Sequence, residues 1–406
     1  MIANNSIIPD LRDFNSSLKG IELLEKLKIV TKSSVGVYCL LPLGAVLVSR
    51  LEETIKKCFN DFDCFEVRFP TLLTEKIWRK SLRWESFDSL LKIKDRSNKF
   101  MCLNPTHEEA SVETLSNVIQ SHKDLPITMY CLNKVYRDEI RVRNGLLRTK
   151  EFIMADAYSF AINSNSSNEQ YKQLIEIHRL IFNRLGLKLI EAEADNGDIG
   201  GSLSQEFIYL YNLGESFLVG CENCNTWTTI MNHNQNDYCQ ICNHKLIQKR
   251  GAELAHIFQL DQIYTKTMGM RILNSKNNLE YPYMNCSGIG VTRLLQILVE
   301  TEFDMNRKIA PSIISPFQIM ICQNNMNESS EKSRELYKKL SQNGFRTLYD
   351  SRKLHVNQKL ILSDMLNCSL NIFYETGLFK LQYKNQNLDV HESDIEILVE
   401  KILTRK

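Results

Sequence analysis

Two pairs of cysteines near the middle of the chain restrict its fold more than any other feature. The stretch CENCNTWTTIMNHNQNDYCQIC holds Cys221, Cys224, Cys239 and Cys242 as two C-x-x-C pairs separated by fourteen residues. Such pairs predict a zinc site, although a spacer of about 15–20 residues is more usual. Four thiolates would complete a tetrahedral site and leave no coordination position open. We therefore expect a structural zinc clip, with two thiol turns without metal as the alternative. His233 and His244 lie nearby but are not needed as ligands.

Composition and length narrow the class of protein. The 406 residues predict two or three domains. The first residues, MIANNSIIPDLRDFN, lack the basic and apolar pattern of a signal peptide, so the twelve cysteines are expected to be cytosolic thiols. No segment is apolar over the roughly 20 residues that a membrane span needs. The formal charge of +2 does not by itself indicate a nucleic-acid partner. We expect a cytoplasmic protein.

Apolar periodicity predicts the main elements. Helices are expected over 20–30, 43–59, 107–120 and 169–186, with Thr106 placed to cap the third. Strands are expected over 65–73, 127–142 and 149–160, and a hairpin over 90–104. Residues 306–316 have two prolines and no helical period, which indicates a linker. The last stretch alternates strands and helices, which predicts a small α/β domain with a mixed or parallel sheet.

A charged stretch in the predicted sheet has the residue types of a phosphate site. In VYRDEIRVRNGLLRTKEF (135–152), Arg137 and Glu139 are two apart on a predicted strand and so share a face. Arg148 lies on the returning strand and could reach the same face. Guanidinium forks bind phosphates bidentately, so this face suits a polyphosphate. An exposed hairpin with paired charges explains the segment equally well.

Two further stretches are less specific. In SGIGVTRLL (287–295), Gly288 and Gly290 allow close backbone approach and Arg293 follows in the first helical turn. The stretch is neither a dinucleotide fingerprint nor a Walker A loop, and alone it indicates an ordinary loop before a helix. In NPTHEEA (104–110), Thr106 and Glu108 could bind an ammonium group. A simple helix cap with a favourable charge is the plainer explanation.

Taken together and in order, these stretches resemble bacterial-type prolyl-tRNA synthetases, which are class II aminoacyl-tRNA synthetases. The resemblance is carried by GVYCLLPLG (36–44), FPTLL (69–73), NPTHEE (104–109), SHKDLPITMY (121–130), KVYRDEIRVRNGLLRTKEFIMADAYSF (134–160), NGDIGGSLSQEF (196–207), RGAELAHIFQL (250–260) and GIGVTR (288–293). It implies an α+β protein. A catalytic domain over 1–305 would have an antiparallel sheet with flanking helices, and the cysteine clip would occupy 217–249. A linker over 306–316 and an anticodon-binding-like α/β domain over 317–406 would follow.

The resemblance also implies a role for each matching residue. Arg137 would hold the ATP α-phosphate and the proline carboxylate, and Arg293 the γ-phosphate. The remaining ATP-binding residues would be Glu139 on adenine, Arg148 on the phosphates, Phe152 stacked on the adenine ring, and Glu253. The remaining proline-binding residues would be Thr106 and Glu108 on the imino group, with Met154, Asp156, Tyr158, His256, Phe258 and Cys286 around the ring. ATP, Mg²⁺ and structural Zn²⁺ would be the cofactors, and proline and tRNA(Pro) the partners. The stretch over 65–73 resembles motif 1, which implies a homodimer.

The chemistry fits these assignments. Adenylation is an in-line attack of a carboxylate on the α-phosphorus, and positioning with charge neutralisation supplies most of its rate. We therefore expect neither a general base nor a covalent enzyme intermediate.

Several positions depart from the family pattern. Asn104, Gln205, Lys150, Asn285 and Ser287 replace the usual residues, and Asn285 and Ser287 lie near the expected amino-acid pocket. The C-terminal stretch LYDSRKLHVNQKL (348–360) lacks the family's R-P-G run. Arg352 and Lys353 could still contact the anticodon, or they could be solvated surface charges.

The sequence thus predicts activation of proline and its transfer to tRNA(Pro). Many bacterial relatives carry an editing domain inserted after the first C-x-x-C, where this chain has only fourteen residues. We therefore expect no editing of alanyl-tRNA(Pro) in cis. Alternatives are a paralogue that activates proline or a related amino acid for another acceptor, a resistance copy with a changed pocket, and a non-catalytic RNA-binding protein.

Overall fold

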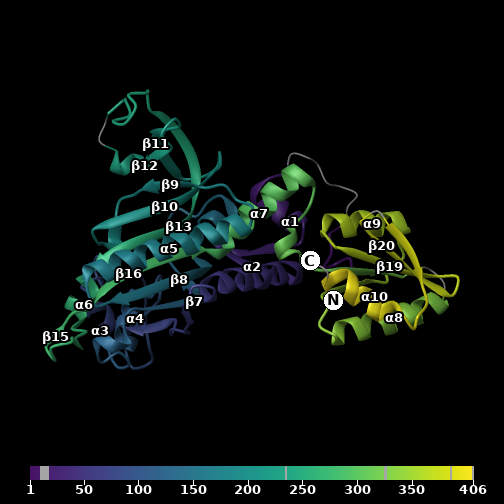
Figure 1. Ribbon diagram of the computed structural model, residues 1–406, viewed down its shortest axis with the longest axis horizontal. Helices are drawn as coiled ribbons and strands as arrows, with labels where there is room; N and C mark the ends of the chain where they lie inside the picture. Colours follow the sequence, from purple (N-terminus) through teal and green to yellow (C-terminus); the bar gives the residue numbers. More distant parts are fainter. Residues whose placement is uncertain (10–17, 234–235, 324–326, 385, 405–406) are drawn as a thin grey trace. The chain divides into compact units, whose positions relative to one another are not determined.

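The computed structural model describes residues 1–9, 18–233, 236–323, 327–384 and 386–404. The N-terminal stretch on which the expectation of no signal peptide rests extends into residues outside these ranges. Contacts divide the chain into two compact units (Figure 1). Residues 34–37 and 52–294 form one, here called the central unit; residues 1–33, 38–51 and 295–406 form the terminal unit. The domain boundaries expected from the sequence stay a prediction.

The central unit is built on a nine-stranded sheet with the order β10-β9-β12-β11-β13-β16-β8-β7-β3. Its strands are β3 (Phe65–Glu66), β7 (Ile127–Tyr136), β8 (Glu151–Ala161), β9 (Ile190–Glu193), β10 (Leu203–Leu210), β11 (Ser216–Cys221), β12 (Thr226–Thr229), β13 (Ile247–Asp261) and β16 (Tyr283–Gly290). Neighbours are antiparallel except at β12–β9 and β3–β7. The predicted antiparallel sheet is therefore confirmed.

Helices cover both faces of this sheet. Helix α5 (Ser164–Arg184) packs on β8, β13 and β16 (Figure 1). The Asn163 side chain caps the first turn of α5, where it accepts a hydrogen bond from Ser166 N. Gly186, with a φ of +74°, follows the end of the helix. The other face holds α3 (Glu75–Lys80), α4 (Glu108–Leu115) and α6 (Ile263–Met268), with the small sheet of β4 (Leu72–Thr74), β5 (Leu91–Lys94) and β6 (Phe100–Leu103). Trp78 of α3 and Tyr264 of α6 join one apolar core with Tyr158 of the sheet.

Two predicted strands and one predicted loop differ from the structure. The strand expected over 65–73 is split into β3 and β4, which belong to different sheets. The strand expected over 127–142 ends at Tyr136. Beyond it, Arg137 N still donates to Lys150 O, and Arg143 N donates to Arg148 O at 3.4 Å. The left-handed residues Asn144 and Gly145 turn the chain back. Arg137, Glu139 and Arg148 therefore come from irregular chain at the strand ends. The glycine pair of SGIGVTRLL lies inside β16 rather than in a loop.

The terminal unit contains a five-stranded sheet with the order β18-β17-β19-β20-β21. Its strands are β17 (Ile319–Cys322), β18 (Thr347–Asp350), β19 (Leu370–Glu375), β20 (Leu378–Tyr383) and β21 (Gln386–Val390). Its helices include α1 (Gly20–Lys26), α8 (Asn327–Gln342), α9 (Val356–Met365) and α10 (Ile395–Thr404), and α2 (Pro42–Asn60) and α7 (Val291–Asn306) pass from one unit to the other. β17 pairs in parallel with β18 and β19, whereas β20 and β21 are antiparallel. The predicted α/β domain with a mixed sheet is confirmed.

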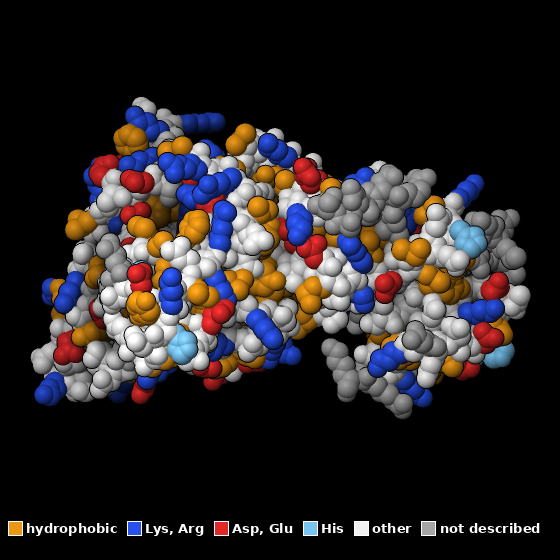
Figure 2. Space-filling model, turned by 90° about the horizontal axis from the view of Figure 1, so that it is seen from above, with side chains coloured by type: hydrophobic (Ala, Val, Ile, Leu, Met, Phe, Trp, Pro, Cys, Tyr) orange, Lys and Arg blue, Asp and Glu red, His pale blue; other side chains and the backbone are white. Residues whose placement is uncertain are grey.

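Charges are mixed over the surface. On the face shown in Figure 2, Lys and Arg side chains are interspersed with acidic and hydrophobic ones. This agrees with the formal charge of +2.

Replacing Leu82 by glycine is expected to stabilise the protein slightly. Leu82 follows α3 with a left-handed φ of 67° and is 73% exposed. That conformation costs a non-glycine residue roughly 1–2 kcal/mol, of which the greater chain entropy of unfolded glycine offsets about 0.4–1 kcal/mol. We expect the thermal midpoint to rise by about 2 °C, measured by circular dichroism. Ile140→Gly, at an exposed site without positive φ, should give no rise; a lower midpoint for Leu82→Gly would contradict the expectation.

Candidate active site

The site is built on one face of the central sheet, where five strands set side chains in rows. Pairing places Cys131, Asp156, Gly288, His256 and Glu206 in one row, and Met129, Tyr158, Cys286, Phe258 and Ser204 in the next. Alternate residues of a strand point to one face, so both rows share the face opposite α5. A Cβ on Gly288 would lie 3.3 Å from Met154 Sδ. Glycine there keeps the floor open.

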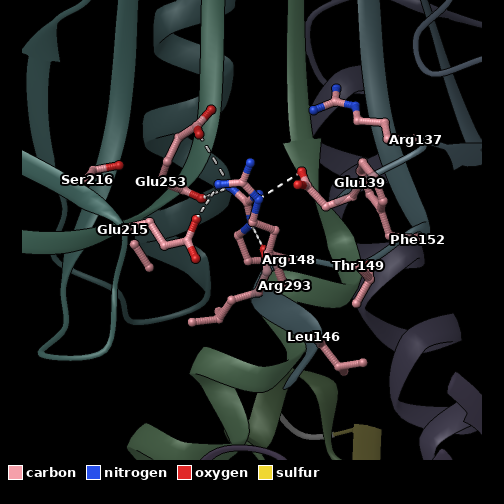
Figure 3. A pocket seen from close by; sticks show the side chains of 12 residues that line it. Arg137, Glu139, Leu146, Arg148, Thr149, Phe152, Glu215, Ser216, Glu253 and Arg293 are labelled. Atoms are coloured by element: carbon pink, nitrogen blue, oxygen red, sulfur yellow. Dashed lines mark hydrogen bonds and ion pairs between the residues drawn. The ribbon is translucent and has the colours of Figure 1, made fainter. Parts of the chain in front are cut away.

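Two adjoining chambers open on this floor. The first, of about 240 Å³, is lined among others by Arg137, Glu139, Arg148, Phe152, Glu215, Glu253 and Arg293 (Figure 3). The second, of about 300 Å³, is lined among others by Thr106, Glu108, Met154, Asp156, His256, Phe258 and Cys286. Arg137, Phe152, Glu253 and Arg293 line both and are here called the shared wall. The structure thus brings together the expected ATP and proline residues. Tyr158 stands on the same face of the sheet, but it is buried and lines neither chamber.

Arginines and carboxylates alternate in the first chamber. Arg148 stands between Glu139 and Glu215, with N–O distances of 2.8 Å to each (Figure 3). Burial opposes ionisation of Glu139, but the hydrogen bond from Arg148 lowers the pKa of this carboxyl. Arg293 Nε donates to the Leu147 carbonyl at 2.9 Å, and its NH1 lies 3.4 Å from Glu253 Oε2. Two guanidinium groups are therefore held in the chamber by acidic partners.

Arg137 differs from the other two arginines. Its guanidinium carbon lies 5.3 Å from the Phe152 ring centroid, and it stands apart from the carboxylates in Figure 3. Among the described residues, its guanidinium has one long hydrogen bond, from NH2 to the Pro105 carbonyl at 3.5 Å, and its buried Nε has no partner. Burial lowers the pKa of Arg137 from its ordinary value. Donors without partners on a shared wall suit an anionic ligand that reaches both chambers.

Sequence reasoning missed Glu215. Its carboxylate pairs with both Arg143 and Arg148; burial opposes ionisation, but those two hydrogen bonds lower the pKa of Glu215. Glu215 directly precedes β11, which ends at Cys221. Glu215 belongs to no motif. The only sequence signal for a role in the site was its position as a carboxylate directly before a strand.

The second chamber holds an oriented carboxylate at its inner end. Thr106 Oγ1 donates to Glu108 Oε1 at 2.9 Å, and Arg83 NH1 lies 3.3 Å from Glu108 Oε2. The predicted helix cap is wrong: α4 begins at Glu108, His107 takes the N-cap position, and no side chain caps the helix. Thr106 is instead hydrogen-bonded to the carboxylate that lines the chamber.

A second buried carboxylate lies on the floor. Asp156 Oδ2 accepts from the Tyr158 hydroxyl and lies 2.8 Å from His107 Nδ1. Burial opposes protonation of His107, but Asp156 raises the pKa of its imidazole. Carboxylates at this end and Arg137 at the shared wall suit a small molecule with a cation at one end and an anion at the other, as in an amino acid.

Glu206, Glu253 and His256 form a cluster whose ligand atoms lie within 4.8 Å of one another. His256 Nδ1 lies 3.5 Å from Glu253 Oε1 and 3.8 Å from Glu206 Oε1. Burial raises the pKa of Glu206 to about 8. Burial opposes ionisation of Glu253, but His256 and Arg293 lower its pKa to about 2. Carboxylates beside the first chamber are suitable ligands for a divalent cation.

Two of the residues that depart from the family pattern, Asn285 and Asn104, lie away from the chambers. Asn285 Nδ2 donates to Ser159 Oγ at 2.9 Å and to the Ser167 carbonyl at 3.0 Å, on the α5 side of the sheet. Asn104 Nδ2 donates to the Pro70 carbonyl at 3.0 Å. Neither lines the second chamber. Ser287 borders it, with a buried Oγ that has no partner. Lys150 pairs with Asp138 at 3.2 Å.

The four cysteines of the clip converge. The sulfur atoms of Cys221, Cys224, Cys239 and Cys242 lie within 4.8 Å of one another. Cys221 and Cys242 are 3.5 Å apart, close to the roughly 3.8 Å expected for two sulfurs of a tetrahedral zinc site. Each C-x-x-C is followed by a left-handed asparagine, Asn225 or Asn243. The cluster fits a structural zinc site. Residues 234 and 235 of the spacer lie outside the described residues.

The residues expected at an anticodon lie in the terminal unit. Arg352 is bound to Asp350 by two hydrogen bonds of 2.9 and 2.7 Å, whereas Lys353 is exposed. Their role stays a prediction. Within the described ranges, no helix has the length and apolar character of a membrane span.

Comparison with known proteins agrees with this fold and site. Residues 91–302 match the tRNA synthetase class II core domain (G, H, P, S and T). The structure aligns with that of prolyl-tRNA synthetase from Cryptosporidium parvum complexed with L-proline and AMP. The TM-score is 0.68 at 16% identity, over 94% of this chain and 74% of the other. The fold and the site define a class II aminoacyl-tRNA synthetase core.

Curated relatives narrow the family. The chain is 34% identical to proline–tRNA ligase of Ehrlichia ruminantium (strain Gardel) over 380 residues, which cover 88% of each chain. It is 31% identical to proline–tRNA ligase of Anaplasma phagocytophilum (strain HZ), over 93% of this chain and 92% of the relative. The chain belongs to the prolyl-tRNA synthetase family.

Proposed function

We propose that this chain uses ATP to convert proline to prolyl-adenylate and then transfers proline to tRNA(Pro). Membership of the prolyl-tRNA synthetase family supports the reaction. The observation that carries the proposal is the shared wall, because Arg137, Phe152, Glu253 and Arg293 line both chambers. A carboxylate in one chamber and an α-phosphate in the other would meet at this wall.

In this proposal each chamber binds one substrate. Phe152 stacks on adenine and Glu139 contacts its edge, while Arg148 and Arg293 bind phosphates. Arg137 contacts the α-phosphate and the proline carboxylate together. The imino group of proline lies at Thr106 and Glu108. Its ring is surrounded by Met154, Asp156, His256, Phe258 and Cys286, and the Tyr158 hydroxyl supports Asp156 by a hydrogen bond.

Charge neutralisation and alignment account for the chemistry. The proline carboxylate is ionised at neutral pH and attacks the α-phosphorus directly, while the bond from that phosphorus to the bridging oxygen breaks and pyrophosphate leaves. No side chain therefore has to accept a proton. Arg148 has to exchange Glu139 and Glu215 for phosphate oxygens, and bidentate guanidinium–phosphate pairs favour that exchange. Mg²⁺ would be held by the carboxylates of Glu206 and Glu253, and when bound it supplies positive charge to the phosphates.

A homodimer is part of the proposal. In the stretch that resembles motif 1, Phe65 is 58% exposed and Leu72 is 42% exposed. Large apolar side chains at this exposure are suited to burial against a second copy of the chain.

Proline-dependent ATP–pyrophosphate exchange, followed by charging of tRNA(Pro), tests the function. We expect both activities from the purified chain. Exchange without charging would instead support a paralogue with another acceptor, and no exchange with any amino acid would refute the proposed activity.

We also propose that the enzyme does not edit alanyl-tRNA(Pro). Only fourteen residues separate Cys224 from Cys239, too few for a hydrolytic domain. Alanine lacks about two methylenes of proline, and each one discriminates by only about 1–3 kcal/mol. We expect measurable alanine-dependent exchange, and we expect added alanyl-tRNA(Pro) to decay at the rate seen without enzyme. Heat-inactivated enzyme is the control, and rapid deacylation by the native enzyme would contradict the prediction.

A further inference from the structure

Arg83 is a buried arginine close to the second chamber, but it does not line it. Only 7% of its surface is exposed. Its guanidinium carbon lies 4.8 Å from the Phe87 ring centroid, 5.2 Å from that of Trp78 and 5.4 Å from that of Tyr264. Aromatic faces attract a guanidinium group that has lost its water. The three rings therefore hold the Arg83 charge at one place behind the chamber.

The charge is directed at two adjacent carboxylates. Arg83 NH1 lies 3.3 Å from Glu108 Oε2 and 3.0 Å from Glu109 Oε1. Glu108 is 2% exposed and Glu109 is fully buried. Over the part of the chain that the structure describes, neither carboxylate forms an ion pair with another basic residue. Ser81 adds a neutral donor to Glu109 Oε1 at 2.6 Å.

Two neighbouring carboxylates in an apolar setting repel each other and favour protonation. Burial raises the pKa of Glu109, while Arg83 counteracts the shift. Burial also acts against the Arg83 charge, but Glu109 and Glu108 outweigh it and raise the pKa of the guanidinium. The three groups therefore form one charge system, in which a single cation serves two anions.

The two oxygens of Glu108 have different partners. Oε2 faces Arg83 and Oε1 accepts from Thr106, which lines the chamber. The pairing with Arg83 fixes the rotation of the carboxylate and leaves the Oε1 side toward the chamber. A protonated or rotated Glu108 would be a poorer partner for a cationic ligand group.

We propose that Arg83 is a positioning residue for amino-acid recognition, which holds Glu108 as an oriented anion for the imino group of proline. The inference rests on the proposed function. It assigns Arg83 no contact with substrate and no part in the nucleotide chamber. Loss of Arg83 is therefore predicted to raise the KM for proline and to leave the KM for ATP unchanged.

The test compares Arg83→Met and Arg83→Lys with the wild type in ATP–pyrophosphate exchange. Charged hydrogen bonds of this kind correspond to about tenfold to hundredfold in affinity. We expect the KM for proline to rise by about that factor in Arg83→Met, with kcat and the KM for ATP within about threefold. Arg83→Lys should be intermediate, because an ammonium group keeps the charge but stacks and pairs less well. The matched control is Arg79→Met, four residues before Arg83 and in the last turn of α3. The partners of Arg79, Glu75 and Glu85, lie outside both chambers.

The outcomes separate this inference from the proposed function. Absence of proline-dependent exchange in the wild type would refute the function. An unchanged KM for proline in a folded Arg83→Met variant, or an equal rise in the KM for ATP, would refute the role of Arg83. If circular dichroism shows that Arg83→Met does not fold, Arg83→Lys decides, and wild-type kinetics in that variant would overturn the inference.

Discussion

Replacement of Arg137 by alanine will lower the rate of proline-dependent ATP–pyrophosphate exchange by on the order of a thousandfold. Arg137 lines both chambers, and its buried Nε lacks a protein partner. Its guanidinium is thus placed to contact both reacting groups as negative charge develops on the α-phosphate. The loss should appear mainly in kcat, because the interaction strengthens in the transition state.

The control for this variant is Arg271→Ala, which removes an exposed guanidinium bound to Tyr281. It should keep wild-type exchange, and both variants should keep wild-type circular dichroism. A folded Arg137→Ala enzyme with activity within tenfold of the wild type would contradict the proposed contact of Arg137 with both reacting groups.

Loss of one clip cysteine will have the largest effect on stability. We expect Cys239→Ser to bind little zinc and to lower the thermal midpoint by roughly 10 °C, because structural zinc contributes directly to folding. β11 ends at Cys221 and begins after Glu215, whose carboxylate holds Arg148. The variant should therefore also raise the KM for ATP. Metal content by mass spectrometry, thermal denaturation and exchange kinetics measure the three effects.

Cys39→Ser is the matched control, since Cys39 is exposed and outside the cluster. It should keep zinc and the wild-type midpoint. A wild-type chain that is fully stable after chelation and contains no metal would contradict the zinc clip.

Much of the site could be predicted because its residues lie in short, ordered motifs. Arg137 and Glu139 were expected on one strand face, yet they lie beyond the end of β7 and still line one chamber. The two side chains still share one site although their local conformation is not a strand. The reason is that the backbone hydrogen bond from Arg137 to Lys150 keeps the two segments together.

Strand alternation could have placed Asn285 correctly. If Cys286 faces the chamber, then Asn285, its neighbour on β16, has to face the other side. The structure puts Asn285 there, bonded to Ser159 and Ser167. Its substitution therefore bears on packing against α5 rather than on the choice of amino acid.

Arg83 and Glu215 could not be found from the sequence, since each acquires its role through contacts between distant segments. Glu215 is paired with Arg148 from the turn after β7. Arg83 lies between Trp78 and Phe87 in the sequence, and an arginine among aromatic residues is at most a hint of a cation held by rings.

The shared wall also links the two ligands thermodynamically. A bound nucleotide would cover Arg137 and Phe152, which also line the chamber proposed for proline. The factor by which ATP changes the affinity for proline must then equal the factor by which proline changes the affinity for ATP. Phe258 lines the second chamber but does not belong to the shared wall. A substitution there should alter the affinity for proline and leave that factor unchanged. A substitution within the wall alters both affinities and the cooperativity between them.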